Sequence, residues 1–272
     1  MNPEENGSLF VEERKIKILE MIRKHKKVTV NHLCEVFHVS SGTIRNDLRE
    51  LESKGLLIRT HGGALIKTKT SFEPDSKQRE IQQLQEKQGI AEAALQLIED
   101  GDTIIIDAGT TTLELAKKLG ERRDVTVVTN DIRVASCLEE IDTVNIVLIG
   151  GRLRKKFHCT VGTLGGKMLS ELMVDKAFIG ANSFSLKRGA TSPGINQADI
   201  RKAMIAISNK VILLCDSSKI GKNSFVQFAA LDQIDTLVTD HMLPDDQKKL
   251  EESGVEVIIA ALGTVGFANS NW

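Results

Sequence analysis

The chain has 272 residues, 41% of them hydrophobic and 27% charged, which is typical of a globular protein with a sizeable core. It has no apolar run near the roughly 18 residues that a membrane-spanning helix needs. Its first residues, MNPEENGSLF, lack the basic and apolar regions of a signal peptide. Its four cysteines are widely spaced without a CxxC pair, which argues against a disulfide framework or a zinc site. We therefore expect a cytoplasmic protein with no membrane association, no metal and no other cofactor.

The net charge of −1 conceals an uneven distribution along the chain. Residues 11–70 hold 13 Lys and Arg against 7 Asp and Glu, whereas the remainder is acidic overall. A small basic part joined to a larger acidic part indicates a polyanionic partner for the first part only. A solvated basic surface would give the same count, so charge alone leaves that alternative open.

The first part is predicted to contain three helices. Apolar residues recur at helical spacing among charges over residues 11–26. Thr29 is a candidate N-cap of a second, short helix, and Ser40 caps a third one after a tight turn. The predicted apolar faces of these two helices consist of Val30, Leu33, Phe37, Ile44, Leu48 and Leu51. Two short helices with so tight a turn form a helix-turn-helix, here at about residues 28–47.

The third helix has small and polar residues on its solvent side. A recognition helix presents its N-terminal residues to base edges in the major groove, so small side chains there permit a close approach. Serine and threonine can bond bases or phosphates, arginine suits guanine, and asparagine suits adenine. The predicted DNA contacts of this helix are Ser41, Thr43, Arg45, Asn46 and Arg49. The alternative is that the third helix is an ordinary solvent-exposed helix with no role in DNA binding.

The sequence LLIRTHGGALI at residues 56–66 predicts a β-hairpin, because two β-prone runs flank a His-Gly-Gly turn. A hairpin directly after a recognition helix is a wing. Arg59, His61 and Gly62 would then lie beside DNA phosphates. Residues 11–66 are thus predicted to be a winged helix-turn-helix that binds double-stranded operator DNA.

The second part follows a polar stretch, residues 67–88, which predicts a linker and the start of a connecting helix. Seven β-branched runs then alternate with helical stretches, which predicts a doubly wound, mostly parallel α/β domain over residues 78–260. The expected strands are 103–107, 125–129, 145–150, 176–181, 210–215, 235–239 and 255–260. The last residues, 261–272, are small and polar, and we expect a disordered tail.

The residues that follow each strand are candidates for a ligand site, since ligands of such sheets bind beyond the carboxyl ends of the strands. After the strand at 103–107, Gly109 and three threonines lead into a helix whose N-terminus suits a phosphate. The other strands run into carboxylates, an amide and basic groups, a set that suits a polyhydroxylated anion. Taken singly, several of these residues could equally be turn residues and helix caps.

Both parts resemble the DeoR family of bacterial transcriptional regulators. The segment TIRNDLRELESKGLLIRTHGGA is similar to the family's N-terminal signature, with His38 where the turn usually has glycine and Arg45-Asn46 where Arg-Arg is common. IDAGTTT, VVTND, LIGGRLR, IRKAMI and DSSKIG, over about 78–240, resemble its effector domain, which is built like ribose-5-phosphate isomerase and binds phosphorylated sugars. The resemblance implies an effector site formed by Asp107, Gly109, Thr110, Thr111, Thr112, Asn130, Asp131, Gly150, Gly151, Arg154, Arg201, Asp216 and Lys219.

The isomerase-like fold raises the alternative of an enzyme. Sugar-phosphate isomerisation needs a general base, and isomerases of this type carry an acidic DGADE segment after a strand. The matching residues 179–183 read IGANS, without any of the three acids. We therefore expect no catalysis but a repressor of a carbohydrate uptake or catabolic operon, relieved by a phosphorylated sugar and assembled as a dimer or tetramer. An activator with the same domain layout is the remaining alternative.

Overall fold

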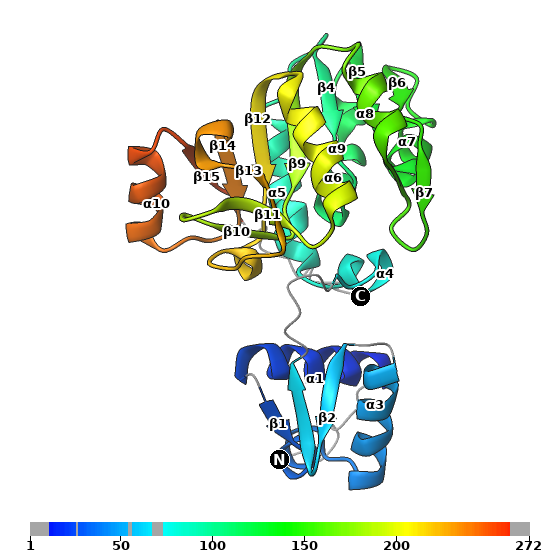
Figure 1. Cartoon of the computed structure of the whole chain (residues 1–272), viewed down its shortest axis with the longest axis vertical. Helices are drawn as coiled ribbons and strands as arrows, with labels where there is room; N and C mark the ends of the chain where they lie inside the picture. The colour runs from blue at the N-terminus through cyan, green and yellow to red at the C-terminus, as the bar shows by residue number, and fades with distance from the viewer. Residues whose placement is uncertain (1–10, 26, 54–55, 67–72, 262–272) are drawn as a thin grey trace, which may run out of the picture. The chain divides into compact units, whose positions relative to one another are not determined.

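The computed structural model describes residues 11–25, 27–53, 56–66 and 73–261, and the chain divides into two compact units, residues 1–72 and 73–272 (Figure 1). Residues 67–72 of the predicted linker and all but the first residue of the predicted tail lie outside the described residues. None of the described helices has the length and apolar character needed to cross a membrane.

The N-terminal unit combines three helices with a small antiparallel sheet in the order β1-β3-β2. Its elements are α1 (Val11–His25), β1 (Lys27–Thr29), α2 (Val30–Phe37), α3 (Ser41–Ser53), β2 (Leu57–Thr60) and β3 (Gly63–Ile66). The helix-turn-helix and the hairpin wing are present as predicted. Strand β1, which pairs with β3, was not predicted, because three residues carry too little pattern to identify a strand.

Side-chain caps and one left-handed residue set the geometry of the helix-turn-helix. Thr29 Oγ1 accepts a hydrogen bond from the His32 amide at 3.3 Å, and Ser40 Oγ accepts one from the Thr43 amide at 3.2 Å. Both predicted N-caps are therefore confirmed. Between them His38 has φ 51° and ψ 39°, the left-handed conformation expected where a glycine is more usual.

A buried ion pair fixes α3 on α1. Arg14 Nε donates to Asp47 Oδ2 at 2.6 Å and Arg14 Nη2 donates to Asp47 Oδ1 at 3.2 Å, and both side chains are buried. The apolar face of α3, with Ile44 and Leu48 fully buried, packs into the same core. The opposite face of α3 is therefore left to solvent.

The C-terminal unit is built on a parallel sheet of seven strands in the order β15-β14-β12-β9-β4-β5-β6 (Figure 1). The strands are β4 (Thr103–Ile106), β5 (Val125–Thr129), β6 (Val144–Leu148), β9 (Val174–Gly180), β12 (Ser208–Leu214), β14 (Thr236–Thr239) and β15 (Glu256–Ile259). These are the seven predicted strands. The doubly wound α/β prediction is confirmed.

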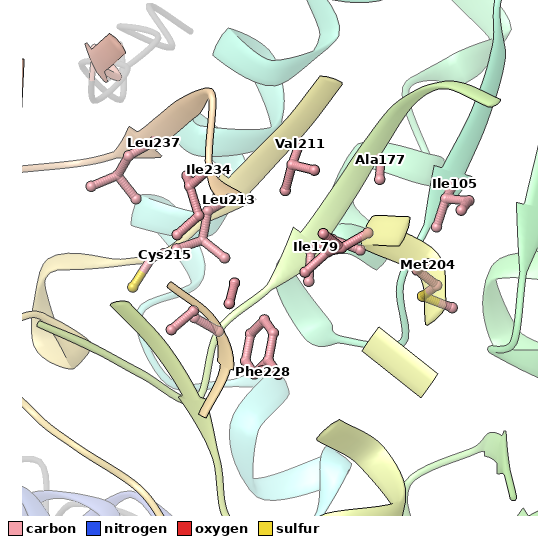
Figure 2. Close-up of a cluster of buried hydrophobic side chains, with 14 of the residues drawn as sticks. Ile105, Ala177, Ile179, Met204, Val211, Leu213, Cys215, Phe228, Ile234 and Leu237 are labelled. Carbon is pink, nitrogen blue, oxygen red and sulfur yellow. The ribbon is translucent and has the colours of Figure 1, made fainter. Parts of the chain in front are cut away.

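Two separate hydrophobic cores cover the two faces of this sheet. Ile105 faces one core, shown in Figure 2, whereas its neighbours Ile104 and Ile106 face the other. Helices α8 (Thr163–Leu169), α9 (Ile195–Ala206) and α10 (Pro244–Glu252) contribute to the first core. Helices α5 (Leu84–Leu95), α6 (Thr110–Ala116) and α7 (Ile132–Leu138) contribute to the second. Burial on both faces explains why the strands are continuously apolar.

Several short elements surround the carboxyl ends of the strands and were not predicted. They are α4 (Ser76–Glu80), the hairpin of β7 (Arg152–Arg154) and β8 (Cys159–Val161), and a sheet of β10 (Ser183–Ser185), β11 (Gly189–Ser192) and β13 (Val226–Ala229). Helix α4 and the start of α5 lie within residues 76–88, where the end of a linker and the start of a connecting helix were expected. Ser76 and Lys87 are buried there, so this stretch is folded as part of the C-terminal unit.

We predict that Gly63→Ala destabilises the N-terminal unit. A Cβ atom at residue 63 would lie 2.1 Å from the carbonyl oxygen of Val28, because β1 and β3 approach closely there. Strand β1 would have to move, and we expect the free energy of unfolding to fall by about 2 kcal/mol or more. Gly42→Ala is the control, since a Cβ at residue 42 would make an ordinary contact of 3.6 Å with Ser40 Oγ. Chemical denaturation of the full chain measures the free energy of unfolding of both variants. Equal values for Gly63→Ala and Gly42→Ala would contradict the predicted clash.

Candidate DNA-binding surface and effector site

The predicted DNA-contacting residues of α3 lie on its solvent-facing side. Ser41, Arg45, Asn46 and Arg49 are exposed and Thr43 is half-buried. Asn46 and Arg49 are joined by a hydrogen bond of 3.3 Å, whereas Arg45 forms no ion pair or hydrogen bond with the part of the chain that the structure describes. The Arg45 guanidinium thus keeps all its donors available for a partner.

The wing is a tight hairpin braced against the helices. His61 and Gly62 form its two-residue turn, and both are exposed. Gly62 has φ +92°, which favours glycine, and its carbonyl accepts a hydrogen bond from the Val30 amide at 2.8 Å. Glu52 Oε1 accepts a hydrogen bond from the backbone amide of Arg59 at 2.9 Å, while the Arg59 side chain is exposed. The wing tip and its arginine are therefore held in fixed positions next to α3.

The candidate effector residues lie at one edge of the C-terminal sheet. Strands β12, β9, β4, β5 and β6 are consecutive neighbours and all run in the same direction. Asp216, Asp107, Asn130 and Gly150 follow four of these strands, so the fold brings them to the same edge.

The centre of this edge is a buried ion pair between β4 and α9. Arg201 Nε donates to Asp107 Oδ2 at 2.8 Å, and each side chain is 2% exposed. The same carboxylate oxygen accepts a hydrogen bond from the Gly180 amide at 3.2 Å, and Arg201 Nη1 donates to Asn182 Oδ1 at 2.9 Å. Burial raises the pKa of the Asp107 carboxyl, and the charge of Arg201 opposes that rise. Both groups find partners despite their burial.

A second carboxylate, Glu73, extends this network. Asn182 Nδ2 donates to Glu73 Oε1 at 2.8 Å, and Arg154 Nη1 donates to Glu73 Oε2 at 2.8 Å. Arg79 Nη1 lies 3.2 Å from Glu73 Oε1, and the guanidinium groups of Arg154 and Arg79 lie 3.6 Å and 5.6 Å from the ring centroid of Phe157. Burial favours a higher pKa for the Glu73 carboxyl, but Arg79 and Arg154 outweigh it and hold that pKa below its ordinary value.

Glu73, Arg79 and Asn182 were not among the predicted site residues. Glu73 and Arg79 stand in a polar stretch, FEPDSKQRE, where charged residues are expected on any solvated linker. Asn182 lies in the segment IGANS, which differs from the isomerase segment by the absence of three acids. That asparagine amide, standing directly after β9, was the available signal.

Asn130 and Asp131, at the end of β5, are both buried and each has one engaged and one free polar atom. Asn130 Nδ2 donates to the Thr160 carbonyl at 2.9 Å, and Asp131 Oδ1 accepts a hydrogen bond from the Arg133 amide at 2.8 Å. Asn130 Oδ1 and Asp131 Oδ2 have no hydrogen-bond partner among the described residues. Burial also raises the pKa of the Asp131 carboxyl. Buried acceptors without a donor are uncommon, which makes these two oxygens candidates for hydrogen bonds from ligand hydroxyl groups.

The threonine loop and the two glycines border the same edge. Thr110, Thr111 and Thr112 are buried at the start of α6, and Thr112 Oγ1 donates to the Gly109 carbonyl at 3.0 Å. The proton of that hydroxyl is therefore committed within the loop. Gly150 and Gly151 connect β6 to β7, the strand that ends at Arg154.

Asp216 and Lys219 form a pair of their own, with a distance of 2.8 Å between Asp216 Oδ2 and Lys219 Nζ. Burial favours a higher pKa for the Asp216 carboxyl, but Lys219 outweighs it and lowers that pKa. Nearby, burial lowers the pKa of Lys87 to about 8, and its ammonium group donates to the carbonyl oxygens of Arg79 and Gln82. The structure thus joins Asp107, Arg201 and Arg154 in one network and keeps Asp216 with Lys219.

Comparison with known proteins agrees with this two-unit organisation. Residues 14–70 match the DeoR-like helix-turn-helix domain, and residues 82–241 match the DeoR C terminal sensor domain. The chain is 37% identical to the HTH-type transcriptional regulator GlpR of Haloferax volcanii, over 90% of this chain and 96% of that protein. It is 36% identical to the HTH-type transcriptional repressor GlcR of Bacillus subtilis, over 92% of this chain and 97% of that protein.

Among solved structures, a D-ribose-5-phosphate isomerase in complex with phospho-erythronic acid is 21% identical, over 49% of this chain and 52% of that chain. Its TM-score of 0.38 is too low to bear on fold or function. The family matches, in contrast, cover both units, and the two regulators are similar along nearly the whole chain. The chain belongs to the DeoR family of transcriptional regulators.

Proposed function

We propose that this protein represses a carbohydrate uptake or catabolic operon and that a phosphorylated sugar relieves the repression. The observation that carries the proposal is the polar network at the carboxyl edge of the sheet, in the domain that matches a family sensor domain. The similarity to a transcriptional repressor over 92% of the chain supports repression over activation. An activator with the same layout is the alternative, and a transcription assay of the controlled promoter separates the two.

The chemistry of the edge suits a sugar phosphate. A sugar has many hydroxyl groups that need acceptors, and the free oxygens of Asn130 and Asp131 are acceptors. A phosphate needs several donors, which arginine side chains and the first amides of a helix supply. In this proposal, Arg154, Arg79 and the loop that opens α6 would supply these donors.

The contacts of Asn182 argue against an isomerase. It stands in the segment that is acidic in the isomerases and whose acids this chain lacks. Its amide oxygen accepts a hydrogen bond from Arg201 and its amide nitrogen donates to Glu73, and an amide cannot act as a general base. We propose that this edge binds a ligand without transforming it.

On the DNA side, α3 would enter the major groove with Ser41 and Arg45 towards base edges, and the wing would contact phosphates through Arg59 and His61. A repeated or palindromic operator requires more than one DNA-binding domain, so we propose that the protein forms a dimer or tetramer. We also propose that it acts in the cytoplasm. Effector binding would then change operator affinity by about 5- to 150-fold, the usual range of coupling between two sites.

We predict that Arg45→Ala weakens binding to a fragment of the protein's own promoter by about tenfold or more, because a bidentate arginine–guanine contact is worth about 1–3 kcal/mol. Its thermal stability should be unchanged, since the side chain is exposed and forms no hydrogen bond or ion pair within the described part of the chain. Lys202→Ala is the matched control, because it removes one exposed positive charge from the C-terminal unit. Fluorescence anisotropy measures both. If wild type and Arg45→Ala bind the fragment with equal affinity, α3 does not read the DNA through Arg45.

We also predict that a phosphorylated sugar lowers the affinity of the full chain for the same fragment. A panel of hexose and pentose phosphates should contain a compound that weakens binding by about 5-fold or more. The same sugars without phosphate are the control and should have no effect. If no phosphorylated sugar changes the dissociation constant in either direction, the protein is not a sugar-phosphate sensor.

A further inference from the structure

Two arginines at the edge of the sheet share a single carboxylate. Arg201 pairs with Asp107, and Arg133 pairs with Glu80 and, at 3.9 Å, with Asp131. Arg79 and Arg154, in contrast, both pair with Glu73, and within the described ranges neither has an ion pair with another carboxylate. The Glu73 carboxylate therefore lies between two guanidinium groups. Two guanidinium groups around one anion favour a group that carries more negative charge than a carboxylate.

The donors around Glu73 converge as they would on a bound oxyanion. Arg79 Nη1, Arg154 Nη1 and Asn182 Nδ2 lie 2.8–3.2 Å from its two carboxylate oxygens. Arg201 donates to the amide oxygen of Asn182, so the amide nitrogen is held towards Glu73. The guanidinium groups of Arg154 and Arg79 also lie over the Phe157 ring, 3.6 Å and 5.6 Å from its centroid. Arg154 and Asn182 each have a further hydrogen bond, to Gln197 and from Arg201, which would hold them if another anion took the place of Glu73.

Solvent can reach the two arginines, although it hardly reaches the carboxylate. The Glu73 side chain is 3% exposed, whereas those of Arg79 and Arg154 are 17% and 28% exposed. Glu73 is also the first residue of the C-terminal unit, directly after the residues that join it to the DNA-binding unit. An anion could therefore approach the guanidinium groups from solvent, and its arrival would affect a residue next to the junction of the two units.

We propose that Arg79, Arg154 and Asn182 form an anion subsite, which Glu73 fills in the free protein and from which the phosphate of the effector displaces it. This inference rests on the proposed function, because it assigns one part of the sugar phosphate to one part of the site. A phosphate dianion balances two guanidinium groups and offers three oxygens to the three donors. The phosphate and Glu73 cannot both stay, because two anions would share one site. Effector binding thus exchanges an internal ligand for an external one.

Glu73→Gln tests the exchange with inorganic phosphate as the probe. The variant keeps the shape of the side chain but removes the charge that competes with phosphate. We expect the full chain with this change to bind inorganic phosphate at least about tenfold more tightly than wild type in calorimetry, because an internal occupant reduces apparent affinity by the fraction of time that the site is open. An unchanged or weaker phosphate affinity would overturn the proposal.

Two further variants make the result specific. Asp102→Asn removes a carboxylate from the ion pair with Lys176 in the same unit and should leave phosphate affinity unchanged. Arg154→Gln, added to Glu73→Gln, should abolish the gain. A gain that persists without Arg154, or that Asp102→Asn reproduces, would show a general charge effect and refute the subsite.

Melting temperatures provide a second readout if Glu73→Gln is unstable. Phosphate should raise the melting temperature of Glu73→Gln more than that of wild type, because it replaces the missing charge between the arginines. Equal rises in the two proteins would mean that Glu73 is only a structural partner of the arginines.

Failure of this inference can be told from failure of the proposed function. If Glu73→Gln gains phosphate affinity but no sugar phosphate alters promoter binding, the subsite stands and sugar-phosphate sensing does not. If a sugar phosphate alters promoter binding but Glu73→Gln gains no affinity, sensing stands and the subsite is refuted.

Discussion

The buried ion pair between Asp107 and Arg201 is the contact on which the candidate effector site depends. It joins the end of β4 to α9, and both side chains are 2% exposed. A buried pair is tolerated only when further hydrogen bonds satisfy both groups, and the Gly180 amide and Asn182 do so here. The orientation of the Asn182 amide follows from that arrangement, and so does the position of the carboxylate of Glu73. The contacts of Asn182 and Glu73 therefore depend on the ion pair between Asp107 and Arg201.

The N-terminal unit also contains a buried ion pair, which here fixes the position of a helix. Its buried pair, Arg14 with Asp47, fixes α3 on α1 and leaves the opposite face of α3 to solvent. A rigid helix can present Arg45 at a defined angle, which reading bases in a groove requires. A regulator of this kind needs a DNA-binding helix in a fixed position and a sensor domain in which a ligand can replace one contact. We propose that Glu73, the first residue of the C-terminal unit, makes that replaceable contact.

The fold was largely predictable because its signals are local. Continuous β-branched runs gave all seven strands of the parallel sheet, and hydroxyl residues before apolar periods gave the caps Thr29 and Ser40. The site was predictable only in part. Asp107 and Arg201 were each expected, but Glu73 was not, since its bond to Asn182 joins residues 109 positions apart in a segment with no apolar pattern. Contacts between residues so far apart in the sequence arise from tertiary packing, which periodicity and local propensity do not encode.

The central claim is that an effector phosphate and Glu73 compete for the same two arginines. The segment that carries Glu73 is tied down by a backbone hydrogen bond of 3.1 Å from the Ser76 amide to the Lys156 carbonyl. Hydrogen exchange of that amide in wild-type protein, with and without saturating inorganic phosphate, is the most direct measurement. We expect exchange at Ser76 to become faster with phosphate, because release of Glu73 loosens the segment. Exchange that is unchanged or slower while phosphate is bound would contradict the displacement of Glu73.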